Sequence, residues 1–374
     1  MDTQVISPTE ENLKKLSDAI LAGKLVAIPT ETVYGLGANA FNVDAVLEVF
    51  KAKERPLFDP LICHVSKPAG AMDEKYLEHL DSWGLIEKKL LPASIEKKYL
   101  KLMEKFWPGP LTLLFPRGNK ISDLVTSGLS TVGVRMPDHG VTQKLLSEAG
   151  VPVAAPSANR FGRISPTTAS AVSQELSGRI PYILDGGQCG VGLESTVVGF
   201  EEDRLVVLRP GGVSMEALSA ELGEKVSRGL DVSSSAAGLK SPGMTLSHYA
   251  PSKPFHVLGT SLAEAVKLNE VDPLGLLSEK TKPTNVGVLI FSPVHVAVLS
   301  HMRGCYPGIL FEVISLCHGP LKIEQAARNL FYFMRKFDES NVQIIFAEAS
   351  PTEEGLGFAI SDRLKRAAIK AVTH

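Results

Sequence analysis

The sequence predicts two α/β domains in series: a larger one built on a twisted sheet with a cationic concave site, and a smaller Rossmann-like one with a parallel sheet. Short apolar runs alternate with segments of helical periodicity along most of the 374 residues, a length that suits two ordinary domains. The 32 glycines and 24 prolines are typical of a loop-rich chain rather than a helical bundle. We expect domains at 1–226 and 254–374, joined by a linker at 227–253.

Composition and charge argue against several classes of protein. The formal net charge of −2 gives no global field that would attract nucleic acid or a membrane. The four cysteines form no C-x-x-C pair, so we expect a reducing compartment and neither a disulfide framework nor a zinc site. The first residues lack a signal-peptide pattern, and no apolar run reaches the length of a membrane span. We therefore expect a cytoplasmic protein without membrane contact.

The apolar strand predicted at 25–28 gives the earliest indication of a site. A helix with apolar residues at helical spacing precedes it at 9–21. The strand runs into Thr30, Glu31 and Thr32, and two glycines follow. Hydroxyls and glycines at the end of a buried strand are where α/β proteins place ligands, because the backbone there can approach them closely. A plain strand and turn would also explain this segment taken alone.

Basic residues and a histidine follow next along the chain. A helix predicted at 43–52 is followed by Lys53 and Arg55, whose positive charges would also complement the helix dipole. The next predicted strand, at 61–65, has His64 near its end. The segment 67–105 is rich in Lys, Glu and Leu, and we assign no chemistry to it.

Two later strands carry polar residues that a buried strand would not need. Arg135 interrupts the apolar strand predicted at 131–137, where a guanidinium must be paired or must reach a ligand. The strand predicted at 151–155 leads into Ser157 and Asn159. Both features favour a ligand at these strand ends.

Ser165 and the proline after it predict the start of a helix that ends near residue 178. The N-terminus of such a helix offers free N–H groups to an anion, although a simple cap is the commoner use of such a serine. We expect further strands at 182–185 and 206–209 and a helix at 215–222. Arg209 ends the second of these strands.

The smaller domain is predicted from a second alternation of strands and helices. We expect strands near 255–258, 286–291 and 342–348 and helices at 323–337 and 357–371, which together indicate a small parallel sheet. The linker before it lacks periodicity, but its end at 241–251 contains Pro, Gly, His and Tyr in an unusually specific mixture.

The residues allow one kind of chemistry better than others. The sequence contains no P-loop, no G-x-S-x-G elbow and no H-E-x-x-H. It does carry cations and hydroxyls at strand ends and few carboxylates, as suits the positioning of polyanions in phosphoryl or nucleotidyl transfer. The pattern alone leaves a non-enzymatic binder equally open.

A series of segments, in order along most of the chain, resembles the two-domain form of the YrdC-type threonylcarbamoyl-AMP synthases. Each segment is short, but the series is specific. In the first domain the segments are PTETVYGLG at 29–37, KAKERP at 51–56, PLICHV at 60–65, FWPGPLT at 106–112, VGVRMP at 132–137, APSAN at 155–159, SPTT at 165–168, LDGG at 184–187, ESTVV at 194–198 and LRPGG at 208–212. Those nearer the C-terminus are SPGM at 241–244, HYAP at 248–251, GLG at 355–357 and DRL at 362–364.

The resemblance implies a reaction in which L-threonine, bicarbonate and ATP give threonylcarbamoyl-AMP, pyrophosphate and water. The product would feed downstream transferase proteins that form threonylcarbamoyladenosine on tRNA; whether this chain binds tRNA directly stays open. Mg²⁺ would arrive with the triphosphate and would need no dedicated cage of carboxylates. An RNA-binding module of the same fold, without synthase activity, is the alternative.

The resemblance also implies roles for individual residues. The threonine contacts would be Thr32, His64, Arg135, Ala155 and Ser195. The catalytic signatures would be Lys53 with Arg55 and Ser157 with Asn159, and the ATP contacts would be Arg55, Asp59, Thr131, Ser157, Ser165, Arg209 and Tyr249. Arg135 suits a carboxylate bidentately, and Lys53 and Arg55 suit charge that builds on the α-phosphate.

Two features depart from the family pattern, and one invites a further expectation. Asp59 stands where the family commonly has Asn, and a carboxylate would repel a triphosphate. The segment 67–105 exceeds the usual length. The stretch 241–251 is expected to fold over the nucleotide as a lid, with Tyr249 on the ATP phosphates.

Overall fold

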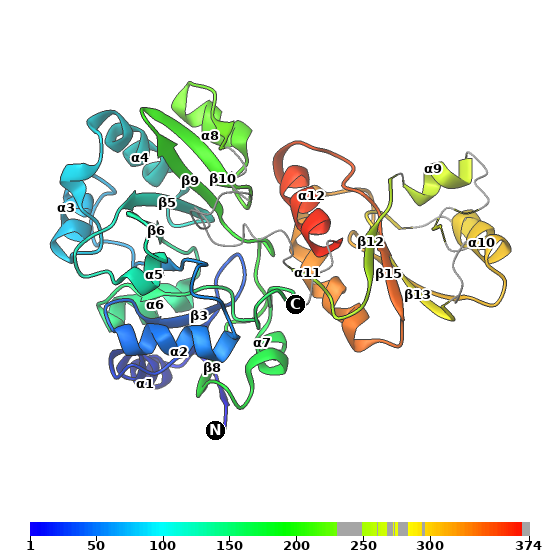
Figure 1. The fold of residues 1–374 in the computed structure, drawn as a ribbon, viewed down its shortest axis with the longest axis horizontal. Helices are drawn as coiled ribbons and strands as arrows, with labels where there is room; N and C mark the ends of the chain where they lie inside the picture. Colours follow the sequence, from blue (N-terminus) through cyan, green and yellow to red (C-terminus); the bar gives the residue numbers. More distant parts are fainter. Residues whose placement is uncertain are drawn as a thin grey trace. The chain divides into compact units, whose positions relative to one another are not determined.

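The computed structural model describes residues 1–229, 249–259, 261–267, 272, 274–275, 283–293 and 296–368 (Figure 1). Contacts divide the chain into two compact units. The first comprises Met1–Phe161 and Ser165–Thr245, and the second comprises Gly162–Ile164 and Leu246–His374. Each unit is α/β and holds one sheet, which confirms the predicted fold class. Among the described residues, no helix combines the length and the apolar character that crossing a bilayer requires.

The first unit is built on a large mixed sheet, in which the strands follow the order β1-β8-β2-β3-β7-β4-β6-β5-β9-β10-β11. Neighbours are parallel in some pairs, such as β4 with β6, and antiparallel in others, such as β5 with β6. In chain order the strands are β1 (Gln4–Ile6), β2 (Val26–Ile28), β3 (Gly35–Asn39), β4 (Ile62–His64), β5 (Leu111–Pro116), β6 (Thr131–Arg135), β7 (Val153–Ala154), β8 (Tyr182–Leu184), β9 (Thr196–Glu201), β10 (Arg204–Arg209) and β11 (Ser227–Arg228).

Helices of the first unit begin where the sequence supplies capping side chains. Thr9 accepts a hydrogen bond from the N–H of Asn12 at the start of α1, and Asn42 accepts one from Ala45 at the start of α2. The helices are α1 (Glu10–Leu21), α2 (Val43–Lys53), α3 (Glu74–Ser82), the 3-10 helix η1 (Lys88–Leu90), α4 (Ala93–Phe106), α5 (Asp123–Thr126), α6 (Gly140–Ala149), α7 (Ala169–Leu176) and α8 (Met215–Leu222).

The segment 67–105 is part of the core of the first unit. It forms α3, η1 and α4, and α4 buries Tyr99, Leu102 and Met103. The hydroxyl of Tyr99 donates to the carbonyl of Leu114 on β5 at 2.9 Å, so the helix is attached directly to the sheet. The Leu-rich composition of this segment therefore serves packing.

The prediction that Ser165 caps a helix is wrong. Helix α7 begins at Ala169, and its N-cap is Thr168, whose hydroxyl accepts from the N–H of Ala171. The Ser165 hydroxyl instead donates to Glu194 at 2.6 Å. Sequence cannot separate these two readings, because a Ser-Pro-Thr-Thr run offers several residues that can cap.

Strand β3 was not predicted, because its sequence, GLGAN, has no run of large apolar residues. It pairs antiparallel with β2 and with β7. Gly37 allows this close pairing, since a Cβ there would lie 2.9 Å from Cγ1 of Val153 and 3.1 Å from the carbonyl oxygen of Val26.

The second unit has a four-stranded parallel sheet of order β12-β15-β13-β14, as predicted for the smaller domain. Strand β14 was not predicted, because it lies at the sheet edge and is only partly buried, so it lacks a clear apolar run. The strands are β12 (Phe255–Val257), β13 (Asn285–Ile290), β14 (Leu310–Ser315) and β15 (Ile344–Ala347), and the helices are α9 (Leu262–Lys267), α10 (Val296–Cys305), α11 (Ile323–Glu339) and α12 (Gly355–Ala368).

Candidate functional site

Strand register brings most of the predicted threonine contacts to one place in the sheet. His64 on β4 lies opposite Arg135 on β6, and Arg135 lies opposite Thr112 on β5. Ala155 directly follows β7, the neighbour of β4, and its N–H donates to the carbonyl of Ile62 at 2.9 Å. These residues are far apart in sequence, so the site depends on sheet topology.

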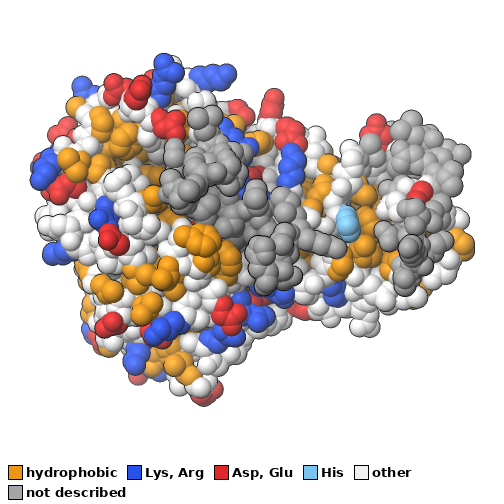
Figure 2. Space-filling view, in the orientation of Figure 1, with side chains coloured by type: hydrophobic (Ala, Val, Ile, Leu, Met, Phe, Trp, Pro, Cys, Tyr) orange, Lys and Arg blue, Asp and Glu red, His pale blue; other side chains and the backbone are white. Residues whose placement is uncertain are grey.

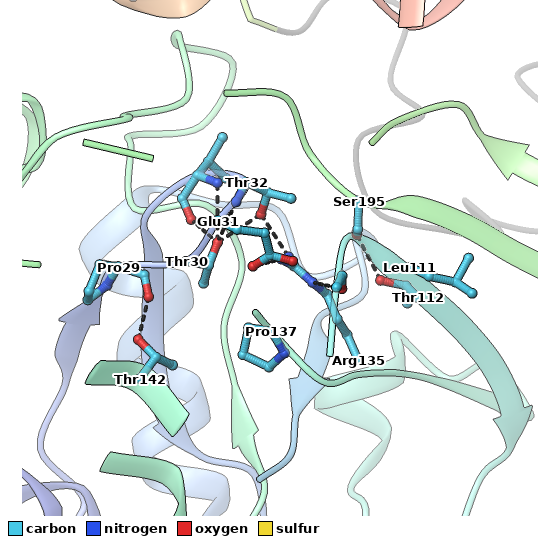
Figure 3. Close-up of polar contacts among 12 residues, drawn as sticks. Pro29, Thr30, Glu31, Thr32, Leu111, Thr112, Arg135, Pro137, Thr142 and Ser195 are labelled. Atoms are coloured by element: carbon cyan, nitrogen blue, oxygen red, sulfur yellow. Dashed lines mark hydrogen bonds and ion pairs between the residues drawn. The ribbon is translucent and has the colours of Figure 1, made fainter. Parts of the chain in front are cut away.

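At this place five buried residues form what we call the polar centre: Glu31, Thr32, Thr112, Arg135 and Ser195 (Figure 3). Nη2 of Arg135 lies 2.6 Å from Oε2 of Glu31, and Nη1 donates to the hydroxyl of Thr32 at 2.8 Å. The hydroxyls of Thr112 and Ser195 are 2.8 Å apart. The centre therefore combines a close ion pair with three hydroxyl groups.

The ion pair of the polar centre is well shielded from water. The side chains of Arg135 and Glu31 are 5% and 10% exposed. The guanidinium also donates from Nε to the carbonyl of Gly109 at 3.3 Å. A buried charge without an opposite charge beside it is costly. Arg135 must therefore keep Glu31 or bind an anionic group of a ligand, and Glu31 must keep Arg135 or bind a cationic group.

His64 is neutral in this environment. Burial lowers the pKa of its imidazole to about 3, and the positive charge of Arg135 lowers it further in the same direction. Within the described residues its Nδ1 has no hydrogen-bond partner. A neutral imidazole beside the polar centre can therefore accept or donate a hydrogen bond without adding charge.

Lys53, the last residue of α2, connects two predicted signatures. Its buried ammonium donates to the carbonyl of Ser157 at 2.5 Å and to the carbonyl of Asn159. Burial, and then the nearby charge of Arg55, lowers the pKa of Lys53 well below its usual value. The side chain of Lys53 thus holds the Ser157–Asn159 loop through two of the backbone carbonyls of the loop.

Asp59 has a clear partner, which accounts for its departure from the family pattern. Nη2 of Arg55 lies 2.9 Å from Oδ2 of Asp59, and both side chains are almost fully buried. The same guanidinium donates to the backbone carbonyls of Asp59 at 3.1 Å and of Pro60 at 2.9 Å. The carboxylate is thus compensated by Arg55, and a triphosphate near this loop would meet a neutral pair.

Two further predicted ATP contacts, Ser165 and Arg209, bond to Glu194 and Ser195 respectively. Ser165 donates to Oε1 of Glu194 at 2.6 Å. Nη2 of Arg209 donates to the carbonyl of Ser195 at 2.9 Å and to its hydroxyl at 3.1 Å. Ser195 belongs to the polar centre. It therefore connects Arg209, a predicted ATP contact, with the predicted threonine contacts.

The first unit also holds an apolar groove, which lies partly on β5 and β6, the strands that carry Thr112 and Arg135. Its cavity volume is about 490 Å³, and its walls come from β5, β6, β9 and β10. A Cβ on Gly199 would lie 3.2 Å from Cδ1 of Leu208 and 3.4 Å from Cδ1 of Leu114, so the missing side chain keeps the groove open. Its lining includes Leu114, Pro116, Thr131, Phe200, Val206 and Leu208.

Comparison with known families decides the classification. A family described as "Telomere recombination" matches residues 18–211, and one described as "Threonylcarbamoyl-AMP synthase, C-terminal domain" matches residues 213–369. The Threonylcarbamoyl-AMP synthase of Bacillus subtilis is 38% identical over 368 residues, which cover 98% of this chain and 95% of that protein. This chain belongs to the threonylcarbamoyl-AMP synthase family.

Other members of the synthase family agree along nearly the whole chain. The protein of the same name from Pyrococcus abyssi is 38% identical, covering 93% of this chain and 91% of its own length. The Schizosaccharomyces pombe one is 37% identical, covering 92% and 84%. The crystal structure of P. abyssi Sua5 complexed with L-threonine has a TM-score of 0.81 at 36% identity and covers 98% of both chains. The resemblance expected from the motifs is confirmed.

Sequence reasoning missed several residues that the structure brings together with the predicted ones. Glu31 pairs with Arg135, Thr112 contacts Ser195, and Glu194 holds Ser165. All three lie inside quoted motifs, but only the folded structure shows that they contact residues more than 25 positions away. Glu31 carried the strongest signal, since a carboxylate next to a buried strand needs a cation.

Tyr249 is the one predicted site residue that lies in the second unit. Its buried ring stacks on Phe331 with centroids 5.5 Å apart, and the guanidinium carbon of Arg363 lies 4.9 Å from the ring centroid. Residues 241–248 of the predicted lid lie outside the described residues. The contact between Tyr249 and ATP stays a prediction.

Proposed function

We propose that this chain is a nucleotidyltransferase that makes threonylcarbamoyl-AMP and pyrophosphate from L-threonine, bicarbonate and ATP. Family membership over both units supports the activity, and the threonine complex of a relative with the same overall fold supports the amino-acid substrate. The observation in this structure that carries the proposal is the buried pair of Arg135 and Glu31.

That pair is complementary to a zwitterionic amino acid. Arg135 offers planar donors for an α-carboxylate, and Glu31 offers acceptor oxygens for an α-ammonium group. When threonine enters, its carboxylate replaces Glu31 on the guanidinium, and its ammonium group becomes the new partner of Glu31. Neither protein charge is then left without a partner. His64, Thr32 and Ala155 line the same place and are the proposed further contacts of threonine.

Glu31 also suits the first chemical step. The α-amine must lose a proton before its nitrogen can form a bond to the carbon of bicarbonate, from which a hydroxyl leaves as water. A carboxylate beside the amine can receive or relay that proton. The resulting carbamate oxygen then attacks the α-phosphorus of ATP, and pyrophosphate leaves.

The nucleotide would lie on the other side of Ser195. Arg209 donates a hydrogen bond to Ser195, and Ser165 donates one to Glu194, the residue before Ser195. Arg209 and Ser165 would therefore lie near the point where the carbamate and the α-phosphate must meet. The apolar groove, which Thr131 lines, would bind the adenine ring of ATP, whose faces are apolar. Mg²⁺ would enter bound to ATP; among the described residues no three His, Cys, Asp or Glu side chains gather into a metal site.

Lys53 and Arg55 act on the loops that face the nucleotide. Lys53 would fix Ser157 and Asn159 through their carbonyls, which leaves the side chain of Ser157 available to ATP. Arg55, neutralised by Asp59, would donate from the same region. We therefore propose a positioning role for Lys53, and a direct phosphate contact for Arg55 only if its pair with Asp59 opens.

The partners and the compartment follow from the activity. The product is an activated carbamoyl donor, so a transferase that acts on tRNA must consume it. All four cysteines are free, and three of them are buried, in keeping with the reducing cytoplasm that we propose.

The deciding experiment measures pyrophosphate released from ATP with threonine and bicarbonate present together and with each omitted in turn. The proposal requires release that depends on both. Tight tRNA binding without such release would favour the RNA-binding alternative. On the face drawn in Figure 2, basic side chains lie among acidic ones and form no single basic stripe among the coloured residues, so we expect synthesis.

A second experiment tests Glu31 separately. L-threonine and 2,3-dihydroxybutanoate, which has no amine, would be titrated into the wild type and Glu31→Gln. Removing Glu31 frees Arg135 for any carboxylate, so dihydroxybutanoate should bind more tightly to the variant, whereas threonine should gain nothing or lose affinity. Equal changes for both ligands would show that Glu31 does not contact the amine.

A further inference from the structure

The parallel sheet of the second unit has a point where its connections diverge. Strands β13 and β15 are neighbours. The chain leaves β13 towards α10, which packs with α9, and leaves β15 towards α12, which packs with α11. Figure 1 shows these two helix pairs on opposite faces of the sheet. In open parallel sheets the crevice at such a point, beyond the carboxyl ends of the strands, is where ligands bind.

A pocket of about 580 Å³ lies at this crevice. Phe291, Ser292 and Pro293 come directly after β13, and the run 348–351 comes directly after β15. Gly259 and the start of α9, which follow β12, line the remaining wall of the pocket. The loops that follow three different strands therefore converge on one cavity.

Glu348 is the polar group at the centre of this pocket. Its Oε1 accepts from the N–H of Leu262 at 2.9 Å, and its Oε2 accepts from the N–H of Phe291 at 3.0 Å. The side chain thus ties the loops after β12, β13 and β15 together. Each carboxylate oxygen has a second lone pair, so the group can still accept a hydrogen bond from a ligand. Burial raises the pKa of Glu348, and the two N–H donors partly oppose that rise.

The chemistry of the lining restricts what the pocket can bind. It contains the carboxylates Glu264 and Glu348 and no Lys, Arg or His among its described residues. Among those described residues a phosphate group would find no counterion, and the sequence of the loop after β12 lacks the glycine-rich fingerprint of dinucleotide sites. Apolar walls are supplied by Leu262, Phe291, Pro293, Val298, Leu321 and Pro351.

We propose that this pocket is a binding site for a small primary amine with an apolar body, held by Glu348 and Glu264 at its ammonium end. The carboxylates supply the charge complement, and Phe291 with the two prolines covers the carbon skeleton. The site is independent of the polar centre and of the proposed synthase reaction, because every group that forms it belongs to the second unit.

Calorimetric titration of the full chain with phenethylamine tests the site, and 3-phenylpropionate and AMP serve as anionic counterparts. Gly259→Leu places a large side chain at a lining position where a Cβ meets no heavy atom within 4 Å, and it is designed to occupy the pocket. Gly319→Leu is the matched control: it also meets nothing within 4 Å and is not a lining residue. Glu264→Gln removes one charge at an exposed position.

We expect saturable binding of one phenethylamine that neither anion shows. Gly259→Leu should weaken it at least about tenfold, because the new side chain takes space that the carbon skeleton of the ligand needs, and Glu264→Gln by about two- to fivefold, because it removes one exposed charge contact. Gly319→Leu should leave the affinity unchanged. Absence of saturable amine binding, equal binding of either anion, or an affinity that Gly259→Leu does not alter would each overturn the proposal.

Discussion

The polar centre and the apolar groove of the first unit share strands β5 and β6, yet they are built in opposite ways. Arg135 in the polar centre is already bound to Glu31, Thr32 and a backbone carbonyl. The groove is an open cavity bounded by Leu114, Leu208 and their neighbours. Binding in the polar centre must therefore exchange one partner for another, whereas binding in the groove only adds contacts. Mutations should affect the two regions in different ways.

The largest effect is expected from Arg135→Gln. It removes the proposed clamp for the carboxylate and leaves Glu31 buried without its cation, which costs about 3–5 kcal/mol of unfolding free energy for a broken buried pair. Threonine-dependent pyrophosphate release should fall below detection, and ATP binding should survive. The double variant Arg135→Gln with Glu31→Gln is the control, since it should recover stability but no activity. Normal activity in that double variant would remove Arg135 from the mechanism.

Lys53→Met should have the next largest effect. The methionine keeps the length of the side chain but removes the donor to the buried carbonyl of Asn159 and the partly buried carbonyl of Ser157, at a cost of about 1–3 kcal/mol for the buried group and less for the other. Both tryptophans lie in the first unit, at 83 and 107, so their fluorescence during urea denaturation reports its stability. We expect weaker ATP binding together with lower stability. A loss of turnover at unchanged stability and ATP affinity would instead give Lys53 a direct catalytic role.

Gly199→Val tests the groove itself. Its new methyl groups would enter the space between Leu114 and Leu208 and should raise the KM for ATP by about tenfold, on the order of the 1.4 kcal/mol that a few lost apolar contacts supply. Threonine affinity should not change. If the threonine affinity falls as much as that for ATP, the groove and the polar centre are not separate regions.

Near neutral pH the smallest effect is expected from His64, because its imidazole is mostly neutral there in both the folded and the unfolded chain and its contribution grows only on acidification. The pKa of His64 is about 3 in the folded protein and about 6.5 in the unfolded chain. As the pH falls, the imidazole of the unfolded chain is therefore protonated before that of the folded protein. The stability of the first unit should therefore decline as pH falls from 6.5 towards 3, by up to about 1.4 kcal/mol per pH unit from this residue. His64→Gln should flatten that part of the curve, measured by urea denaturation between pH 4 and 7. A curve with the same slope in the variant would mean that His64 titrates normally.

Much of the fold could be predicted from sequence, because apolar periodicity and capping signals are local. Helices α1 and α2 and strands β4 and β6 lie within a few residues of where the sequence places them. Strands β3 and β14 could not be predicted in this way. The first is glycine-rich and depends on close pairing with its neighbours, and the second is an edge strand with little burial.

The candidate site was predicted by residue type and resemblance, but its connections were not. Arg135 was expected to need a partner, and sequence gave no means to choose Glu31 over a substrate carboxylate. The pairing of Asp59 with Arg55 was likewise invisible, although it answers the concern that Asp59 would repel a triphosphate. Such contacts depend on strand register and on side-chain packing across the sheet, which local patterns do not encode.

The central claim is that the guanidinium of Arg135 exchanges Glu31 for the carboxylate of threonine. Calorimetric titration of L-threonine and of L-threoninol, which has a hydroxymethyl group in place of the carboxylate, into wild type and Arg135→Gln tests it most directly. The account predicts that the substitution weakens threonine at least about tenfold, as loss of a charge-assisted pair should, whereas threoninol should bind as tightly or more tightly, because its ammonium group no longer competes with Arg135 for Glu31. Equal losses for the two ligands, or an unchanged threonine affinity, would contradict it.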